Sequence, residues 1–396
     1  MLIGLVGRPS TGKSSFFKAA TLSDVAIANY PFTTIEANKG VGFVKVDCVD
    51  KEFNVQCNPR FGYCIKGKRF VPIEMIDVAG LVEGAYEGKG RGNQFLDDLN
   101  QADALIHIID ISGSTNANGE AVEPLSYDPL NDVRFLETEL DMWYLRILKK
   151  GWDKLARTVK GEHGKLGVAV AKQMSGVRVD EKTAEEAINK LNLNGEILKW
   201  NDEDLFKMAS ELRKKTKPMI IAANKIDVPG SEKNLERLNG KFPDYKIIAC
   251  SAESEMALKE AAKKGMISYI PGESDFEVTS TSLNEQQKKA LNFIKEIILK
   301  KYNSTGIQNV LDYAVFGLLE YIAIFPGGVN KLTDKDGNVL PDCFMMPKNS
   351  TALDFAFRIH TDIGKRFVKA IDVKKKIAVG KDHMLKNRDV VEIKTN

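Results

Sequence analysis

Residues 2–17 read LIGLVGRPSTGKSSFF, and this stretch decides the fold of the N-terminal part of the chain. Residues 2–6 are apolar and typical of a buried strand, and residues 15–20 are typical of the first turns of a helix. Between them, residues 7–14 match the pattern G-x-x-x-x-G-K-S, which binds phosphate only when it lies between a strand and a helix. Both conditions are met, so the sequence predicts a phosphate-binding P-loop.

In such a loop the phosphate is bound mainly by backbone N–H groups and by the N-terminus of the following helix, because these groups converge on an anion. Gly7 and Gly12 allow the backbone to close around phosphate groups. We expect the Lys13 ammonium to reach the β- and γ-phosphates and the Ser14 hydroxyl to bind Mg²⁺. The residues predicted to line this part of the site are Gly7, Arg8, Pro9, Ser10, Thr11, Gly12, Lys13, Ser14 and Ser15.

Length and composition describe a globular protein of two or three domains. The chain has 396 residues, of which 43% are hydrophobic and 28% charged, and its formal net charge is +3. The charge is uneven, because residues 325–396 hold 14 Lys and Arg against 9 Asp and Glu. This basic C-terminal part indicates either an anionic partner or a solvated surface, and composition leaves both open.

The five cysteines are odd in number and show no paired framework, which favours a reducing compartment. Cys48, Cys57 and Cys64 are close in sequence, but C-x8-C-x6-C is not a zinc spacing, so we expect free thiols. No signal peptide precedes the P-loop, and no apolar run reaches the roughly 18–20 residues of a membrane span. We therefore expect a cytoplasmic protein.

A loop after the first helix has the features of a nucleotide switch. Residues 29–36 (NYPFTTIE) contain two threonines, and a threonine there can bind Mg²⁺ through its hydroxyl and the γ-phosphate through its N–H. Thr34 is the predicted ligand, and Thr33 is the alternative.

A second switch is predicted where a buried strand ends. Residues 41–44 and 70–76 are typical of strands, and the latter runs into Asp77-Val78-Ala79-Gly80. Asp77 can hold a water on Mg²⁺, and the Gly80 N–H can reach the γ-phosphate. The glycine-rich residues 81–92 favour a loop. The predicted catalytic groups are Lys13, Thr34 and Gly80, and the predicted metal ligands are Ser14, Thr34 and Asp77.

Two further motifs follow apolar strands and indicate which base is bound. Strands are predicted at residues 104–110, 219–223 and 247–250. After the second comes N-K-I-D, whose Asp227 can accept hydrogen bonds from guanine N1–H and its exocyclic amine. We expect Asn224 to brace the P-loop and the Lys225 stem to cover the ring. The last strand ends in Ser251-Ala252-Glu253, where the Ala252 N–H could meet the guanine carbonyl; ligands of open α/β sheets gather at this edge.

Together these motifs resemble the five G motifs of a TRAFAC-class GTPase. Residues 30–34 (YPFTT) and the glycine-rich stretch resemble the Obg-related group, and the overall layout resembles its YchF branch in an archaeal-type form. The resemblance covers nearly the whole chain. It implies an α/β P-loop GTPase domain with a mostly parallel sheet and helices on both faces, an inserted helical hairpin and a C-terminal β-grasp TGS domain. GTP and Mg²⁺ are the cofactors it implies; many YchF relatives carry Glu at the position of Asp227 and prefer ATP, so the intact N-K-I-D favours GTP.

The resemblance also predicts slow hydrolysis. A Gln that orients the attacking water in Ras-type enzymes is replaced here by Leu81, which has no polar group. Some relatives use a P-loop Asn to bind K⁺, but this chain has Ser10 there, which argues against K⁺ assistance. His107 lies within an apolar strand and is predicted to be a core residue, and neither it nor Asp110 is a good base.

The rest of the chain predicts one helical insertion into a simple GTPase plan and further helices after the last motif. A heptad stripe of apolar residues is formed by Val133, Leu136, Leu140, Trp143 and Ile147, and a second stripe begins at Ala184. Residues 161–176 between them are predicted to be a loop. Two stripes joined by a loop favour an antiparallel helical hairpin. Helices are also predicted at residues 284–301 and 307–324. The expected domains are residues 1–128 and 216–325 (GTPase), 129–215 (helical insertion) and 326–396 (TGS).

Local signals agree with a small β-rich domain at the C-terminus. Asp336-Gly337 is a turn signal, residues 350–354 cap a short helix, and residues 390–394 alternate as a strand. We expect its basic side chains to contact phosphates of ribosomal or other structured RNA without reading sequence, and the helical insertion to be a second docking element. These side chains are Lys365, Arg366, Lys369, Lys374, Lys375 and Lys376.

Three functions remain open on the sequence alone. The first is a GTPase with weak intrinsic activity that regulates translation or ribosome assembly, or an ATP-using relative of the same branch. The second is a small-molecule kinase, which needs neither N-K-I-D nor two switch loops. The third is an RNA-binding adaptor in which the nucleotide is only structural, and Leu81 is compatible with it.

Overall fold

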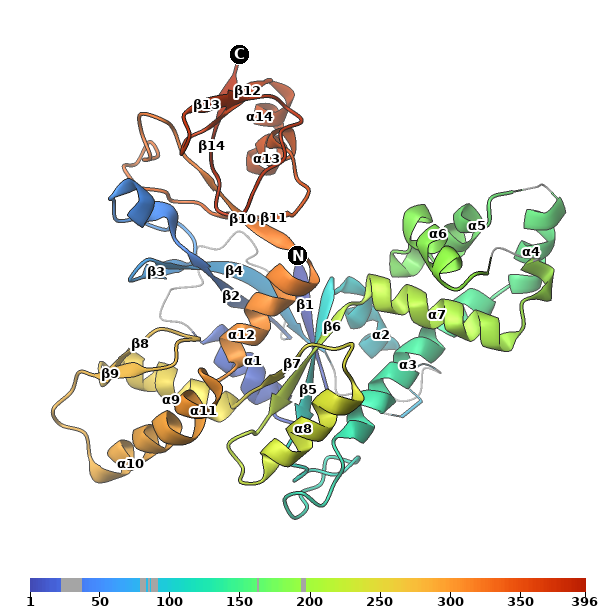
Figure 1. Ribbon diagram of the computed structural model, residues 1–396, viewed down its shortest axis with the longest axis horizontal. Helices are drawn as coiled ribbons and strands as arrows, with labels where there is room; N and C mark the ends of the chain where they lie inside the picture. The colour runs from blue at the N-terminus through green and yellow to red at the C-terminus, as the bar shows by residue number, and fades with distance from the viewer. Residues whose placement is uncertain (23–37, 79–82, 85, 87–91, 162–163, 194–196) are drawn as a thin grey trace. The chain divides into compact units, whose positions relative to one another are not determined.

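The computed structural model describes residues 1–22, 38–78, 83–84, 86, 92–161, 164–193 and 197–396. The chain divides into two compact units, whose elements are labelled in Figure 1. The first contains Met1–Phe16 and Ile76–Ala252, and the second contains Phe17–Met75 and Glu253–Asn396.

A parallel sheet with strand order β4-β1-β5-β6-β7 forms the centre of the first unit, to which β4 contributes its last two residues. All residues of β5 and β6 are buried, which explains why these strands are continuous apolar runs rather than alternating ones. The predicted strands at residues 2–6, 104–110 and 219–223 are confirmed. The bounds are β1 (Leu2–Val6), β4 (Lys68–Asp77), β5 (Ala104–Asp110), β6 (Met219–Asn224) and β7 (Ile247–Ala249).

Helices lie between the parallel strands along the chain. The C-terminal ends of β1, β5 and β6 lie at one edge because the three strands are parallel. This edge receives the P-loop after β1, Asp110 at the end of β5 and Asn224 at the end of β6. The helices α2 (Gly92–Gln101) and α8 (Ser231–Lys241) belong wholly to this unit, whereas α1 (Lys13–Thr21) only begins in it and α9 (Ala252–Lys263) begins at its last residue.

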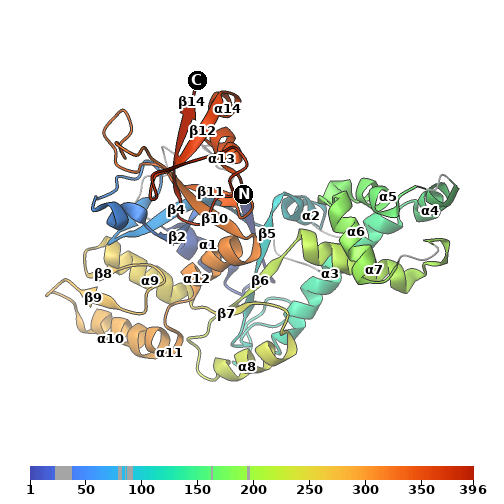
Figure 2. The same cartoon turned by 45° about the horizontal axis from the view of Figure 1, so that its top comes forward.

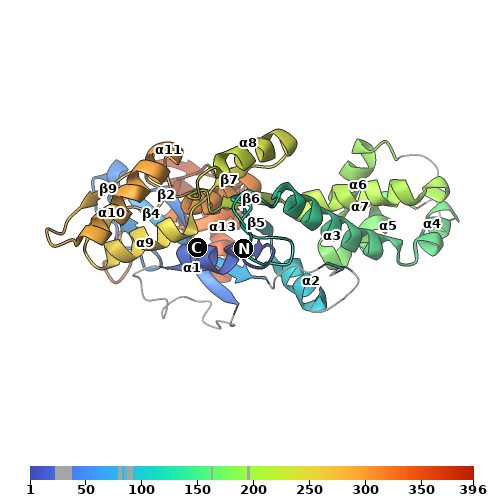
Figure 3. The same cartoon turned by 90° about the horizontal axis from the view of Figure 1, so that it is seen from below.

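In its described residues the insertion after β5 carries the α-helices α3 to α7, and is thus more elaborate than the predicted antiparallel hairpin (Figure 3). The heptad stripe on α3 is buried at Val133, Leu136, Leu140 and Trp143, and α3 packs mainly against α7. The predicted loop at residues 161–176 was wrong, because α5 forms there: Gly167 and Val170 are buried and α5 packs against α6, so tertiary packing overrides the low helix propensity of Gly and Val. The bounds are α3 (Leu130–Lys149), α4 (Trp152–Gly161), α5 (Leu166–Gln173), α6 (Glu181–Lys190) and α7 (Asp202–Thr216).

The second unit begins with the strands predicted at residues 41–44 and 70–76, which are confirmed and longer than expected. β3 and β4 form an antiparallel hairpin, and β2 neighbours β4. A helical segment follows the GTPase motifs, with π-helical turns at Ile294–Leu299 and Tyr313–Leu318. Further elements are β2 (Lys39–Asp47), β3 (Tyr63–Ile65), β8 (Ile267–Tyr269), β9 (Phe276–Val278), α10 (Glu285–Phe293), α11 (Lys300–Tyr302) and α12 (Ile307–Asp312).

A five-stranded sheet in the order β11-β10-β14-β12-β13 ends the chain, and α13 packs on it (Figure 2). The helix predicted to reach Ile324 ends at Leu318, because Tyr321–Pro326 pairs with β11 and β14 as β10. Tertiary pairing thus overrides an apolar run that sequence alone could not distinguish from a buried helix. The capping box predicted before α13 is confirmed at Thr351 and Asp354. The bounds are β10 (Tyr321–Pro326), β11 (Phe344–Pro347), α13 (Ala352–Ile359), α14 (Thr361–Lys365), β12 (Phe367–Asp372), β13 (Ile377–Val379) and β14 (Val390–Thr395).

None of the helices within these described ranges combines the length and the hydropathy that a membrane crossing needs.

A buried carboxyl group at the end of α12 makes stability depend on pH. Burial raises the pKa of Asp312 to about 7, although its carboxylate accepts hydrogen bonds from the Lys45 N–H (2.7 Å) and the Gln308 amide (2.8 Å). Between about pH 4 and pH 7 the folded state holds a proton there that the unfolded state has lost, so the free energy of unfolding should fall as pH rises.

Replacing Asp312 with Asn removes this titration. We expect urea unfolding between about pH 4 and pH 7 to show a smaller loss of stability with pH in Asp312→Asn than in the wild type. Identical slopes in the two proteins would contradict the assignment, and Asp382→Asn, an exposed change in the same unit, is the control.

Candidate nucleotide-binding site

The P-loop connects β1 to α1 through a backbone that only glycine can follow at two positions. Gly12 has φ +88°, and a Cβ there would lie 2.2 Å from the Asn224 side-chain nitrogen. A Cβ on Gly7 would lie 2.5 Å from the carbonyl oxygen of Ile108. Because both clashes are with groups that other contacts hold in place, the two glycines of the motif are structural requirements of this loop.

Lys13, the first residue of α1, forms an ion pair with Asp77 at the end of β4. Their side chains are only 13% and 21% exposed, so the pair is largely shielded from water. The group predicted to contact phosphate and the group predicted to contact Mg²⁺ are thereby brought together. Ser14 is exposed in the first turn of the same helix.

Asn224 connects the P-loop to the last loop of the site. It is 2% exposed, its amide donates a hydrogen bond to the Thr11 carbonyl (3.1 Å), and its carbonyl accepts one from the Ala252 N–H (3.1 Å). The first contact is the bracing role expected from the sequence. The second contact differs from expectation: the Ala252 N–H, which we expected to face the base, donates to the Asn224 side chain instead.

Lys225 is held by a residue for which we predicted no role in the site. Its ammonium lies 2.8 Å from the Asp110 carboxylate and 3.1 Å from the Thr115 hydroxyl, and its backbone has φ 64°. Asp110 is 1% exposed and also accepts hydrogen bonds from Ser112 and Ser114. Its carboxylate therefore fixes the direction of the N-K-I-D lysine.

The charge state of Asp110 supports this arrangement. Burial opposes ionisation, but the hydrogen bond from Lys225 and those from Ser112 and Thr115 hold the pKa of Asp110 below its ordinary value. The signal in the sequence was the position of Asp110 at the end of a strand between two motif-bearing strands. His107, three residues earlier on the same strand, is 1% exposed, and burial lowers its pKa to about 3, as expected for a core histidine.

Asp227 is half-buried, and among the described residues none is recorded as a hydrogen-bond or ion-pair partner of its carboxylate. The backbone around it is fixed, since the Ile226 N–H donates to the Cys250 carbonyl (3.1 Å) and the Val228 N–H to the Lys225 carbonyl (3.2 Å). Ser251 is buried, and Glu253 is exposed in the first turn of α9.

Four predicted residues, Thr33, Thr34, Gly80 and Leu81, lie outside the described residues. The predicted site residues that the structure describes fit a magnesium nucleoside triphosphate. Gly7 and Gly12 keep the loop free of side chains that would otherwise clash there, and Lys13 supplies an ammonium for the phosphates. Ser14 and Asp77 supply hydroxyl and carboxylate oxygens, the kind of ligand that Mg²⁺ prefers.

Comparison with known proteins agrees with this geometry. Residues 2–136 match the family model of a 50S ribosome-binding GTPase, and residues 222–328 match the Obg-like GTPase YGR210-like, G4 motif-containing domain. Residues 329–395 match the TGS domain.

Relatives that match nearly the whole chain are also GTP-binding proteins or ATPases by name. An uncharacterised GTP-binding protein of Methanocaldococcus jannaschii is 50% identical over 394 residues, covering 99% of this chain and 98% of the relative. The ribosome-binding ATPase YchF of Escherichia coli O157:H7 is 26% identical, with 99% and 98% covered. The crystal structure of a GTP-binding protein from Pyrococcus horikoshii OT3 is 39% identical, has a TM-score of 0.77 and matches 100% of both chains.

The fold alone is shared with a more distant structure, the YchF GTPase of Schizosaccharomyces pombe, which is 20% identical with a TM-score of 0.62 over 100% of this chain and 97% of that one. The glycine cradle, the strand-end motifs and these full-length matches have one explanation. This chain belongs to the Obg-like P-loop GTPases, is similar over its whole length to their YchF members, and carries a C-terminal TGS domain.

Proposed function

We propose that this protein binds GTP with Mg²⁺, hydrolyses it slowly by itself, and acts on the ribosome or on structured RNA. The choice of guanine rests on the N-K-I-D loop. Its Asn224 and Lys225 side chains are both fixed by buried partners, whereas the Asp227 carboxylate remains available to accept hydrogen bonds from the base.

In this proposal, separate groups of residues bind the phosphates, the Mg²⁺ ion and the base. The P-loop amides and Lys13 hold the β- and γ-phosphates, and Ser14, Thr34 and Asp77 are the oxygen ligands for Mg²⁺, which offsets negative charge on the phosphates. The Lys225 stem, directed by Asp110, covers one face of the base. Leu81 has no polar group to orient a water molecule, which supports slow hydrolysis without a partner.

An ATP-using protein is the alternative that a specific finding favours. Relatives 27% and 26% identical to this chain are named Obg-like ATPase 1 (Gallus gallus) and ribosome-binding ATPase YchF. Affinities for GTP and ATP measured side by side by calorimetry separate the two, and a preference for ATP would overturn the guanine assignment.

Ribosome dependence tests the regulatory part of the proposal. The names of the bacterial relatives and of the N-terminal family model support ribosome binding. We expect ribosomes to change the rate of multiple-turnover GTP hydrolysis or the affinity for GTP. If neither changes, the regulatory function fails and an adaptor with structural nucleotide remains.

The basic surface of the C-terminal domain offers a residue-level test. Lys374 is paired with Glu52 (2.7 Å) and Lys375 with Asp372 (2.6 Å), so these two are already partly neutralised. The other four are exposed, and no carboxylate of the described residues is recorded as their partner: Lys365, Arg366, Lys369 and Lys376.

We expect Gln at these four positions to weaken ribosome binding at least about tenfold near physiological salt, since each phosphate contact releases counterions. The matched control replaces the paired Lys374 and Lys375 with Gln. Binding curves from ribosome co-sedimentation at several salt concentrations measure both, and an equal loss in the two variants would contradict the role of the exposed four.

A further inference from the structure

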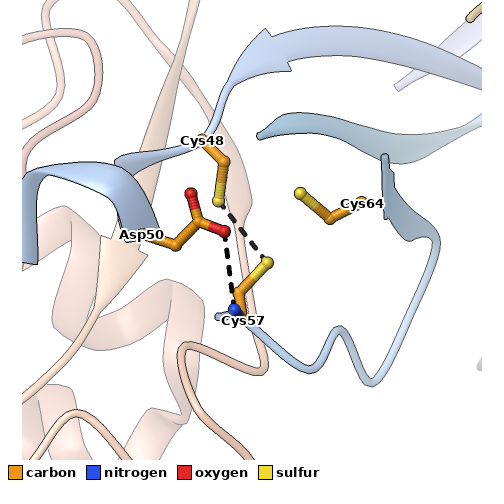
Figure 4. A group of neighbouring side chains, drawn as sticks. All are labelled: Cys48, Asp50, Cys57 and Cys64. Carbon is orange, nitrogen blue, oxygen red and sulfur yellow. Dashed lines mark hydrogen bonds between the residues drawn. The ribbon is translucent and has the colours of Figure 1, made fainter. Parts of the chain in front are cut away.

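Three cysteines and one aspartate of the second unit converge on a single point (Figure 4). Cys48 follows β2, Asp50 lies in the short 3-10 helix Val49–Phe53, Cys57 lies in the next loop, and Cys64 is in β3. One ligand atom from each of the four lies within 4.8 Å of all the others. The C-x8-C-x6-C spacing had argued against such a site, but a loop and a hairpin bring together residues that a simple zinc-knuckle spacing does not.

The sulfur separation is informative. The Sγ atoms of Cys48 and Cys57 are 3.6 Å apart, whereas a disulfide requires about 2.05 Å, and all five cysteines are free. Two thiolates that bind one tetrahedral Zn²⁺ at about 2.3 Å lie about 3.8 Å apart. The observed distance, at which one thiol can also donate a hydrogen bond to the other, fits two ligands of a common ion.

Burial and charge point to a cation. Cys48 and Cys57 are each 3% exposed and Asp50 is 2% exposed, and a buried carboxylate among thiols is costly without a positive partner. Arg69, the cross-strand neighbour of Cys64, is 1% exposed and supplies one positive charge beside the cluster, but its guanidinium donates to the carbonyls of Leu340 (3.1 Å) and Pro341 (2.7 Å). One such charge leaves room for a divalent cation among three thiols and a carboxylate.

The backbone holds the carboxylate in position. One oxygen of Asp50 accepts a hydrogen bond from the Lys51 N–H (2.8 Å), and the other lies 3.5 Å from the Cys57 N–H. Hydrogen bonds of this kind orient ligands around metals. The Asp50 carbonyl also accepts a hydrogen bond from the Val55 N–H (3.1 Å), so the turn that carries the ligand is closed.

We propose that Cys48, Asp50, Cys57 and Cys64 bind one Zn²⁺ ion. Four protein ligands complete a tetrahedral shell and leave no position for substrate, which is typical of a structural site. Thiolates favour Zn²⁺ over Mg²⁺, which prefers six oxygen ligands, so this site is chemically separate from the magnesium ligands of the nucleotide site.

The ion would stabilise the loop that contacts the C-terminal part of the same unit. The Asn58 N–H donates to the Val339 carbonyl (2.8 Å) and the Arg60 N–H to the Pro341 carbonyl (2.9 Å). Arg60 also pairs with Asp334 (3.0 Å). Because Cys57 begins this loop and Cys64 follows it, zinc would fix both of its ends.

Metal analysis of the full chain, produced without a histidine tag and kept under reducing conditions, tests the proposal. We expect one equivalent of zinc by elemental mass spectrometry, and Cys57→Ser should weaken zinc binding at least about 100-fold in chelator competition, beyond the effect of losing an outer contact. Cys343→Ser is the matched control, since Cys343 is a free cysteine of the same unit outside the cluster. A wild type that binds no zinc, or that is isolated with a Cys48–Cys57 disulfide, would overturn the site.

A second variant separates metal binding from simple packing. Asp50→Cys gives a four-thiolate set, so it should retain zinc and, with Co²⁺, show a stronger thiolate-to-metal charge-transfer band than the wild type. Removing zinc from the wild type should increase hydrogen exchange in residues 54–62 and 339–341, and adding zinc back should reverse it. Loss of zinc in Asp50→Cys with its fold intact, or unchanged exchange on zinc removal, would contradict the proposal.

Discussion

Lys13→Ala should abolish measurable binding of nucleoside triphosphate while leaving the fold in place. Lys13 is the ammonium of the P-loop, and its contact with the Asp77 carboxylate shows that it lies at the sheet edge where the phosphates are predicted. Charge-assisted hydrogen bonds to phosphate in a shielded site are each worth about 1.5–3 kcal/mol, and Lys13 can donate several. The loss should therefore be at least about 100-fold, measured by titration with a fluorescent GTP analogue.

The control for this variant is Lys18→Ala, because Lys18 lies on the same helix and is exposed. It should bind nucleotide as the wild type does. The far-UV circular dichroism of both variants should match the wild type, since neither substitution removes a backbone hydrogen bond and Ala is a good helix former. Tight binding retained by Lys13→Ala would remove the role given to this lysine.

Asp227→Asn should weaken GTP binding and favour xanthosine triphosphate. The carboxylate accepts two hydrogen bonds in the proposed complex, and an amide presents a donor to one of the guanine donors instead. Hydrogen bonds to a charged group are worth about 1.5–3 kcal/mol each, so the affinity for GTP should fall by roughly 10²–10⁴-fold. Xanthine has a carbonyl where guanine has its amine and so matches the new amide.

Competition between GTP and xanthosine triphosphate for one fluorescent nucleotide measures this exchange. Asp244→Asn, an exposed change beyond α8, is the matched control and should keep the preference for GTP. An Asp227→Asn protein that still prefers GTP would disprove the base assignment without affecting that of Lys13. The two variants thus test opposite ends of the nucleotide independently.

The sequence predicted the sheet well because its strands are buried on both faces and carry their motifs at their ends. Apolar runs such as residues 104–110 and 219–223 are long enough to identify, and their flanking polar residues give the strand direction. The P-loop adds a strand and a helix of fixed order around Gly7 and Gly12, because the loop conformation tolerates nothing else.

Features that depend on distant partners could not be predicted in this way. The stripe on α3 was visible, but its neighbour is α7, some 70 residues later, and no local pattern states that pairing. Tyr321–Pro326 is a strand because β11 and β14 are available to it. The pairing of Asp110 with Lys225 and the cysteine cluster are of the same kind, since each joins residues from separate elements.

Asn224 has a consequence for how this protein can evolve. Its amide supports the loop around the phosphates, its carbonyl supports the loop after the last strand, and Gly12 leaves it no spare room. In the proposed nucleotide complex, recognition of the purine and retention of the triphosphate would therefore both depend on Asn224. A lineage that changes its nucleotide has to do so at Asp227, whose carboxylate takes no part in these two contacts, because drift at Asn224 would damage both properties at once.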